Sequence, residues 1–225
     1  MLRITSVLLL AVAACSAAYA AFPVPPPPNW WTVPPGPSTR LQYHSFQANP
    51  NLNLPPDWTH NGYAPSIPDS WTLPTNITYN VTIPNYWPFY WQNYPGANLN
   101  DGIGAHLPQG GTLTKRMGNI HIDSQVKEYY ALAIWYGPLD ALSITVTSEP
   151  GAVVNPLSSW SGGEYGWSAM AVQGTITPQP AWEDFAFAFS SGVYLDSIYV
   201  GTHCIPEPSS LGLLAVAGIG LLRRR

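Results

Sequence analysis

The acidic side chains in the second half of the chain are the residues best suited to acid–base chemistry. A glycoside hydrolase needs only two carboxyl groups, placed on either side of the scissile bond. No spacing in the sequence pairs two of these acids, and the chain has no Gly-x-Ser-x-Gly motif for a nucleophilic serine. We therefore assign no catalytic residue, and a secreted polysaccharide hydrolase stays the alternative to a non-enzymatic role. The acids are Glu128, Glu149, Glu164, Glu183 and Asp184.

Residues that could bind a metal ion are scattered along the chain. None of the five histidines has a zinc-like spacing to a cysteine or to another histidine. His121 and Asp123 would share one face of a strand, which also fits a surface pair at a strand end. The run from Asn98 to Gly102 alternates oxygen ligands as a calcium loop does, but it lacks the downstream glutamate and favours a turn. We expect neither a metal nor another cofactor.

The last twenty residues carry three features in a fixed order. The triplet Pro206-Glu207-Pro208 is followed by an apolar run from Leu211 to Leu222 and then by Arg223, Arg224 and Arg225. Residues 209–222 carry no charge. As a helix they would be about 21 Å long, which is short for a hydrocarbon core of about 30 Å. The sequence predicts a short transmembrane helix over 209–222, with the arginines on the cytoplasmic side.

This tail resembles the PEP-CTERM sorting signal of Gram-negative bacteria, and the resemblance is limited to residues 206–225. It implies that an exosortase-type membrane protease handles the chain and that the inner membrane holds it transiently. The protein would then reach the cell surface or the extracellular matrix. Proteins with this tail resemble, as a group, surface and exopolysaccharide-associated proteins. The resemblance therefore favours a structural or adhesive role, with exopolysaccharide as a partner.

Residues 1–20 have the three parts of a secretory signal peptide. Arg3 supplies the positive charge, residues 7–14 are apolar, and Ala18-Tyr19-Ala20 is a cleavage signal. We expect the mature chain to begin at Ala21. A lipobox-like run that ends at Cys15 offers a competing cut, which would produce a lipoprotein instead.

Charge and cysteine content narrow the classes of function. Between residues 21 and 205 four basic residues stand against eleven acidic ones, a formal net charge of −7, and no basic patch exists. Nucleic-acid binding is therefore excluded. Cys204 is the single cysteine of the predicted mature chain. We interpret it as a small apolar residue that ends the last strand, in preference to a partner in an intermolecular disulfide.

The predicted mature chain has two parts of different composition, which meet near residue 95. Residues 22–95 hold 17 of the 25 prolines and 6 of the 10 tryptophans. We therefore expect extended, irregular chain over 21–95, without long helices or central strands. Trp31, Trp58 and Trp71 recur in copies of a motif that joins proline, Asn or Asp, tryptophan and threonine. Their rings could stack on sugar faces, or they could fasten the segment to a β-core, which we favour for most of its length.

Residues 96–205 show the period-two alternation of β-strands. Val126–Tyr136 and Leu142–Thr147 flank a predicted turn, and the series Phe185, Phe187, Phe189 alternates with small or acidic residues. The pattern predicts a mainly β protein, an antiparallel β-sandwich or jelly-roll-like ectodomain. Further strands are expected at Tyr165–Ile176, Val193–Val200, more weakly Thr112–Ile122, and residues 77–83 of the preceding segment, whereas the serine-rich run Ser158–Gly163 is interpreted as a loop.

Overall fold

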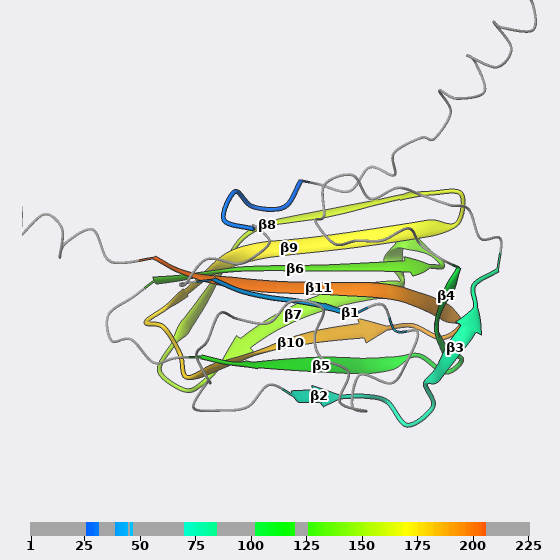
Figure 1. Cartoon of the computed structure of the whole chain (residues 1–225), viewed down its shortest axis with the longest axis horizontal. Helices are drawn as coiled ribbons and strands as arrows, with labels where there is room; N and C mark the ends of the chain where they lie inside the picture. Colours follow the sequence, from blue (N-terminus) through cyan, green and yellow to red (C-terminus); the bar gives the residue numbers. More distant parts are fainter. Residues whose placement is uncertain are drawn as a thin grey trace, which may run out of the picture.

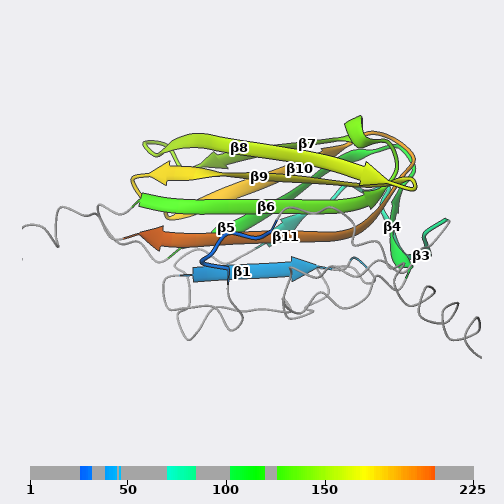
Figure 2. The same ribbon diagram turned by 90° about the horizontal axis from the view of Figure 1, so that it is seen from above.

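The computed structural model describes residues 26–31, 39–44, 46, 70–84, 102–119 and 126–205. Within these residues the chain forms eleven β-strands and one short 3-10 helix, η1 (Leu139–Ala141). Figure 1 shows the strands side by side, and Figure 2 shows them turned by 90°. The predicted signal peptide 1–20 and the C-terminal tail with its predicted membrane segment 209–222 lie outside the described residues.

The larger of two sheets has seven strands, and every pairing in it is antiparallel. Its order is β3–β4–β11–β6–β9–β8, and β1 pairs with β11 on the edge opposite β6. The strands are β1 (Thr39–His44), β3 (Thr78–Thr82), β4 (Ile103–Leu107), β6 (Val126–Tyr136), β8 (Val153–Glu164), β9 (Trp167–Thr177) and β11 (Val193–Ile205).

The smaller sheet has four antiparallel strands in the order β2–β5–β10–β7. They are β2 (Ser70–Thr72), β5 (Gly111–Gly118), β10 (Trp182–Phe189) and β7 (Leu142–Ser148). The prediction of a mainly β protein built from antiparallel sheets is therefore confirmed. The jelly-roll-like connectivity stays a prediction.

The main core lies between the two sheets. Phe185 and Phe187 of β10 are fully buried and cluster with Ala133 and Trp135 of β6, so the inner faces of the sheets pack on each other. Along β10 buried and half-buried residues alternate strictly, because successive side chains of a strand point to opposite faces. Glu183 occupies one of the inward positions of β10 and is 0% exposed.

A second apolar cluster covers the outer face of the larger sheet. Tyr130 and Leu132 of β6 point outward and are buried beneath Trp31 and Leu41. Gly201 of β11 makes room for this cover, since a Cβ there would overlap the Trp31 ring and the Leu41 side chain. The central strands of the larger sheet are therefore buried on both faces, which explains their long apolar runs.

Three strands of the proline-rich part join the sheets at their margins. β1 lies along β11, β3 ends the larger sheet, and β2 ends the smaller one. Edge positions suit this proline-rich part of the chain, because proline has no backbone N–H and so cannot take part in the hydrogen bonds of a central strand. The expected alternation around residues 77–83 is present in β3, with a register shift that accompanies a positive φ of 56° at Asn80.

Several expected boundaries can be compared with the strands observed. β6 has the bounds that were predicted, and β7, β9 and β10 each cover the residues expected within one or two positions. The interpretation of Ser158–Gly163 as a loop is wrong, because these residues lie in β8 and pair with β9. β5 ends at Gly118 within the expected stretch Thr112–Ile122, of which residues 120–122 lie outside the described residues, and β11 extends five residues past Val200.

Candidate functional site

A groove lies on the outer face of the larger sheet, where residues of the segment 26–31 line it. This segment is dark blue in Figures 1 and 2. The larger part of the groove is a cavity of about 580 Å³. Two aromatic residues, Tyr129 of β6 and Trp30, line this cavity together with polar side chains. The lining extends to Ile205, the last residue of β11. The lining residues are Pro28, Asn29, Trp30, Glu128, Tyr129, Leu157, Gln173, Gly174, His203 and Ile205.

A smaller cavity of about 260 Å³ adjoins the first and shares Gln173 with it. Tyr130 and Trp160 supply its aromatic walls, and Ser158 adds a hydroxyl group. Trp160 packs against the outer apolar cluster and is half-buried, so part of its ring faces solvent. The two cavities meet at Gln173, and we refer to them together as the groove, with one tryptophan in the lining of each.

Trp30 lines the larger cavity of the groove and stacks on His203. Its ring lies over that of His203, with centroids 5.7 Å apart and planes inclined by 12°. A turn fixes its direction, because the Trp31 backbone N–H donates to the Pro28 carbonyl at 2.8 Å. Trp31 then points into the sheet, where its ring packs edge-to-face with that of Tyr130 at a centroid distance of 5.7 Å, while Trp30 stays half-buried.

The polar side chains of the groove come from neighbouring strands. Glu128 of β6 stands opposite His203 of β11 in the ladder, and Gln173 of β9 stands opposite Tyr130. All four point outward, because they follow the alternation of the outer apolar cluster. Burial lowers the pKa of His203 below its usual 6.5, and the Glu128 carboxylate opposes that shift. His203 Nδ1 also lies 2.9 Å from the Thr39 hydroxyl.

This arrangement suits binding more than acid–base chemistry. Aromatic faces give flat apolar contact, and amide, carboxylate and imidazole groups at their rim can exchange hydrogen bonds with hydroxyls. Among the residues that line the two cavities, Glu128 is the single carboxylate. Hydrolysis of a glycosidic bond by a carboxyl pair would need a second one.

The other predicted acids lie away from the groove. Glu183 is buried between the sheets, and Asp184 binds Arg116 at 2.6 Å on the opposite face of β10. Glu149 Oε1 accepts a hydrogen bond from the Ala181 backbone N–H at 2.8 Å, and Glu164 ends β8. His121, Asp123 and residues 98–101 lie outside the described residues, and the described part of the chain contains no cluster of three or more metal-ligating side chains.

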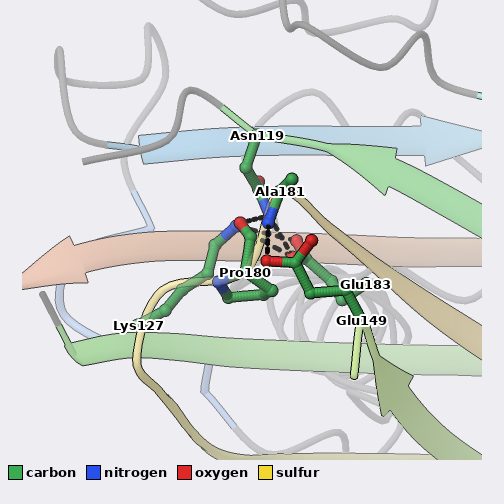
Figure 3. Close-up of polar contacts among 6 residues, drawn as sticks. All are labelled: Asn119, Lys127, Glu149, Pro180, Ala181 and Glu183. Atoms are coloured by element: carbon green, nitrogen blue, oxygen red, sulfur yellow. Dashed lines mark hydrogen bonds and ion pairs between the residues drawn. The ribbon is translucent and has the colours of Figure 1, made fainter. Parts of the chain in front are cut away.

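A buried polar cluster lies between the sheets at the end where β11 finishes. Lys127 of β6 and Glu183 of β10 form an ion pair at 2.8 Å, with side chains 1% and 0% exposed. Asn119, which follows β5, also donates to Glu183 (Figure 3). Desolvation raises the pKa of Glu183 above its usual value, while Lys127 and Asn119 act in the opposite direction.

Two of the three predicted stacking residues, Trp31 and Trp71, lie in the described part of the chain, and both are buried. Trp31 and Trp71 are only 4% and 8% exposed, so neither ring presents an open face to a sugar. Trp71 instead donates from Nε1 to His44 Nε2 at 3.0 Å and packs on Phe46. Trp58 lies outside the described residues. Both rings thus have the fastening role that was the other hypothesis for these tryptophans.

Sequence reasoning missed Trp30 and Trp160, the two tryptophans that line the groove. In the pair Trp30-Trp31 the repeat drew attention to the second ring, although only one of two adjacent side chains can enter the core. Trp160 lies in the run that was interpreted as a loop. In the structure half-buried and exposed residues alternate from Trp160 to Glu164, as in an edge strand, but the residue types of this stretch do not show that alternation.

The predicted processing residues belong to the two terminal segments of the chain. Ala18, Ala20, Pro206, Glu207, Pro208, Arg223, Arg224 and Arg225 lie outside the described residues. Among the helices of the described part, none is long and apolar enough to cross a membrane.

Comparisons with known proteins identify the C-terminal tail. Residues 205–225 match the PEP-CTERM protein-sorting motif. No curated protein and no solved structure matched the chain. The motif implies an exported protein that exosortase processes. The match begins at Ile205, which is both the last residue of β11 and a lining residue of the groove.

Proposed function

We propose that this exported, exosortase-sorted protein is a non-enzymatic component of the cell surface or extracellular matrix, and that its groove binds polysaccharide. The observation that carries the proposal is the groove itself, in which Trp30 and Trp160 accompany Glu128 and Gln173. Its place on the outer face of a seven-stranded sheet makes the platform rigid, since the strands beneath it are buried on both sides.

The chemistry of the lining favours a sugar ligand. A sugar ring has apolar C–H faces and a rim of hydroxyls, and it is matched by an aromatic plane with hydrogen-bonding groups beside it. Each of the two adjoining cavities has its own tryptophan, so a chain of several sugar units fits better than a single one.

The charge of the groove selects among polysaccharides. Glu128 is the one ionisable acid in the lining, and the residues that line the two cavities include no lysine or arginine. An anionic polymer would meet a carboxylate without a lysine or arginine beside it in the lining. We therefore propose a neutral polysaccharide as the ligand.

A retention assay that also measures cleavage separates binding from hydrolysis. The purified protein is passed over matrix polysaccharide from the producing bacterium, and released reducing ends are measured in the same sample. Retention without release of reducing ends supports the proposal. Release of reducing ends that disappears in Glu128→Gln would favour the hydrolase instead, and the absence of retention on neutral polymers would exclude the proposed ligand class.

A further inference from the structure

Three polar side chains meet in the space between the two sheets, apart from the binding groove. Lys127, Glu183 and Asn119 are 1%, 0% and 1% exposed. They present an amine, a carboxyl group and a carboxamide to one another at a place that water does not reach. Each comes from a different strand or strand end, so the folded chain alone brings them together.

The carboxyl group of Glu183 accepts hydrogen bonds from Lys127 Nζ and from Asn119 Nδ2. Lys127 Nζ donates to Oε1 at 2.8 Å and to Oε2 at 3.0 Å. Asn119 Nδ2 donates to the same Oε2 and to the Pro180 carbonyl at 3.1 Å. Figure 3 shows the three side chains converging on one point. The amine and the carboxamide are therefore neighbours across a single carboxylate oxygen.

Backbone contacts fix the orientation of the carboxamide. The Pro180 carbonyl can only accept, so the nitrogen and not the oxygen of Asn119 is turned toward Pro180 and Glu183. The Asn119 backbone N–H donates to the Ala181 carbonyl at 2.8 Å, and Ala181 in turn donates to Glu149. The NH₂ group that would leave in an acyl transfer thus points at the group that could protonate it.

The buried ion pair has a neutral form one proton transfer away. A charged pair without water is a costly arrangement, and a shared proton relieves it. If the proton passes from Nζ to Glu183, the site holds a neutral amine, a carboxylic acid and a carboxamide. These are a nucleophile, a proton donor and an acyl group, held together by the fold.

We propose that Lys127 and Asn119 condense inside the folded protein into an internal amide bond, with Glu183 as the proton carrier and ammonia as the product. The bond would link the end of β5 in the smaller sheet to the start of β6 in the larger one. It would replace a buried ion pair by an amide N–H that donates to a neutral carboxyl group. The predicted mature chain has one cysteine, so an intrachain disulfide cannot take this place.

The reaction balances without any further reactant. Lys127 Nζ first gives one proton to Glu183, and the free amine then attacks Cγ of Asn119. Glu183 passes its proton to Nδ2 and takes one from Nζ. The Cγ–Nδ2 bond breaks, ammonia leaves, and the Cγ–Nζ bond remains. The five exchangeable hydrogens end as three on ammonia, one on the new amide and one on Glu183, and no charge is created.

Trypsin gives a direct test, because Lys127 is the only basic residue between Arg116 and Arg223. The full protein is purified from the bacterium that exports it, its ends are mapped, and it is denatured and digested. We expect no free peptide of residues 117–127, and an intact mass about 17 Da below that of the mapped sequence. Fragmentation of a peptide that spans both residues should show a closed loop from 119 to 127.

Variants identify the role of each group. Glu183→Gln should have the full mass and release the 117–127 peptide, whereas Asp184→Asn, its neighbour on the opposite face of β10, should keep the mass loss. Release of an unmodified 117–127 peptide from the wild-type protein would overturn the proposal. That result requires no variant, so it decides the question even if Glu183→Gln does not fold.

Discussion

The ring of Trp30 lies nearly parallel to the ring of His203, with centroids 5.7 Å apart and planes inclined by 12°. This contact joins a residue near the start of the predicted mature chain to the last strand, two residues before the sorting motif begins at Ile205. It also builds one wall of the groove. The part of the chain that we propose to bind polysaccharide is therefore adjacent to the point where the folded domain meets its sorting tail.

His44 makes stability depend on pH. Burial, and secondarily the charge of Lys115, lower the pKa of His44 from 6.5 to about 3. Because the folded pKa is depressed, the unfolded chain takes up the proton first as the pH falls. The contribution of neutral His44 to the free energy of unfolding is fully present above pH 6.5. It is lost as the pH falls toward 3, by up to about 1.4 kcal/mol per pH unit.

Urea unfolding at several pH values from 7 to 4 measures this slope. His44→Gln should flatten it, because glutamine carries no proton that titrates in this range. Equal slopes in the wild type and His44→Gln would mean that His44 is not the responsible group.

Phe187 should carry a large share of the stability of the core. Its side chain is fully buried between the sheets, and Phe187→Ala is expected to lower the free energy of unfolding by about 3–5 kcal/mol. Ala186→Ser on the opposite face of β10 should cost less than about 1 kcal/mol. Chemical denaturation of the two variants tests this difference, and similar losses would contradict the proposed packing of the sheets.

Gly201 should affect polysaccharide binding although it does not line the groove. A Cβ at this position would overlap the Trp31 ring and the Leu41 side chain, so Gly201→Ala is expected to displace the segment that carries Trp30. We expect about tenfold weaker polysaccharide binding, or about 1.4 kcal/mol. Trp31→Ala should have the same effect, and the double variant should be no weaker than either single one, because both act through one contact. Additive losses would indicate two separate effects.

Processing of the tail should be visible in the mass of the protein from each cell fraction. In the wild type we expect a species in the medium that begins at Ala21 and ends near Pro206. In a strain that lacks exosortase the chain should stay in the membrane fraction with Arg225 intact, while its N-terminus is unchanged. A soluble, trimmed species from that strain would show that another protease acts on the tail.

The strands that were predicted best from the sequence are those in which apolar residues form long runs or alternate with other residues along the chain. β6 and β10 have long apolar or alternating runs, and the inward series Phe185, Phe187 and Phe189 follows directly from a period of two. β8 was missed because serine and glycine favour turns, although an exposed edge strand tolerates them. The conformational preferences of single residues do not identify a strand such as β8, in which few side chains are buried.

The candidate site depends on relationships that the sequence does not encode locally. Trp30 reaches His203 only after β11 and the segment 26–31 have come together, and the choice between Trp30 and Trp31 depends on a turn at Pro28. Lys127 and Glu183 are 56 positions apart and meet across two sheets. Such pairs follow from topology, which strand patterns alone leave undetermined.

The most direct test of the account compares polysaccharide binding by Trp30→Ala, Trp160→Ala and Tyr165→Ala. Tyr165 is an aromatic residue 68% exposed outside the groove, and so it controls for loss of surface aromatic area. We predict that each tryptophan variant binds neutral matrix polysaccharide at least about tenfold more weakly than wild type, while Tyr165→Ala binds normally. Unchanged binding in both tryptophan variants would contradict the assignment of the groove as the polysaccharide site.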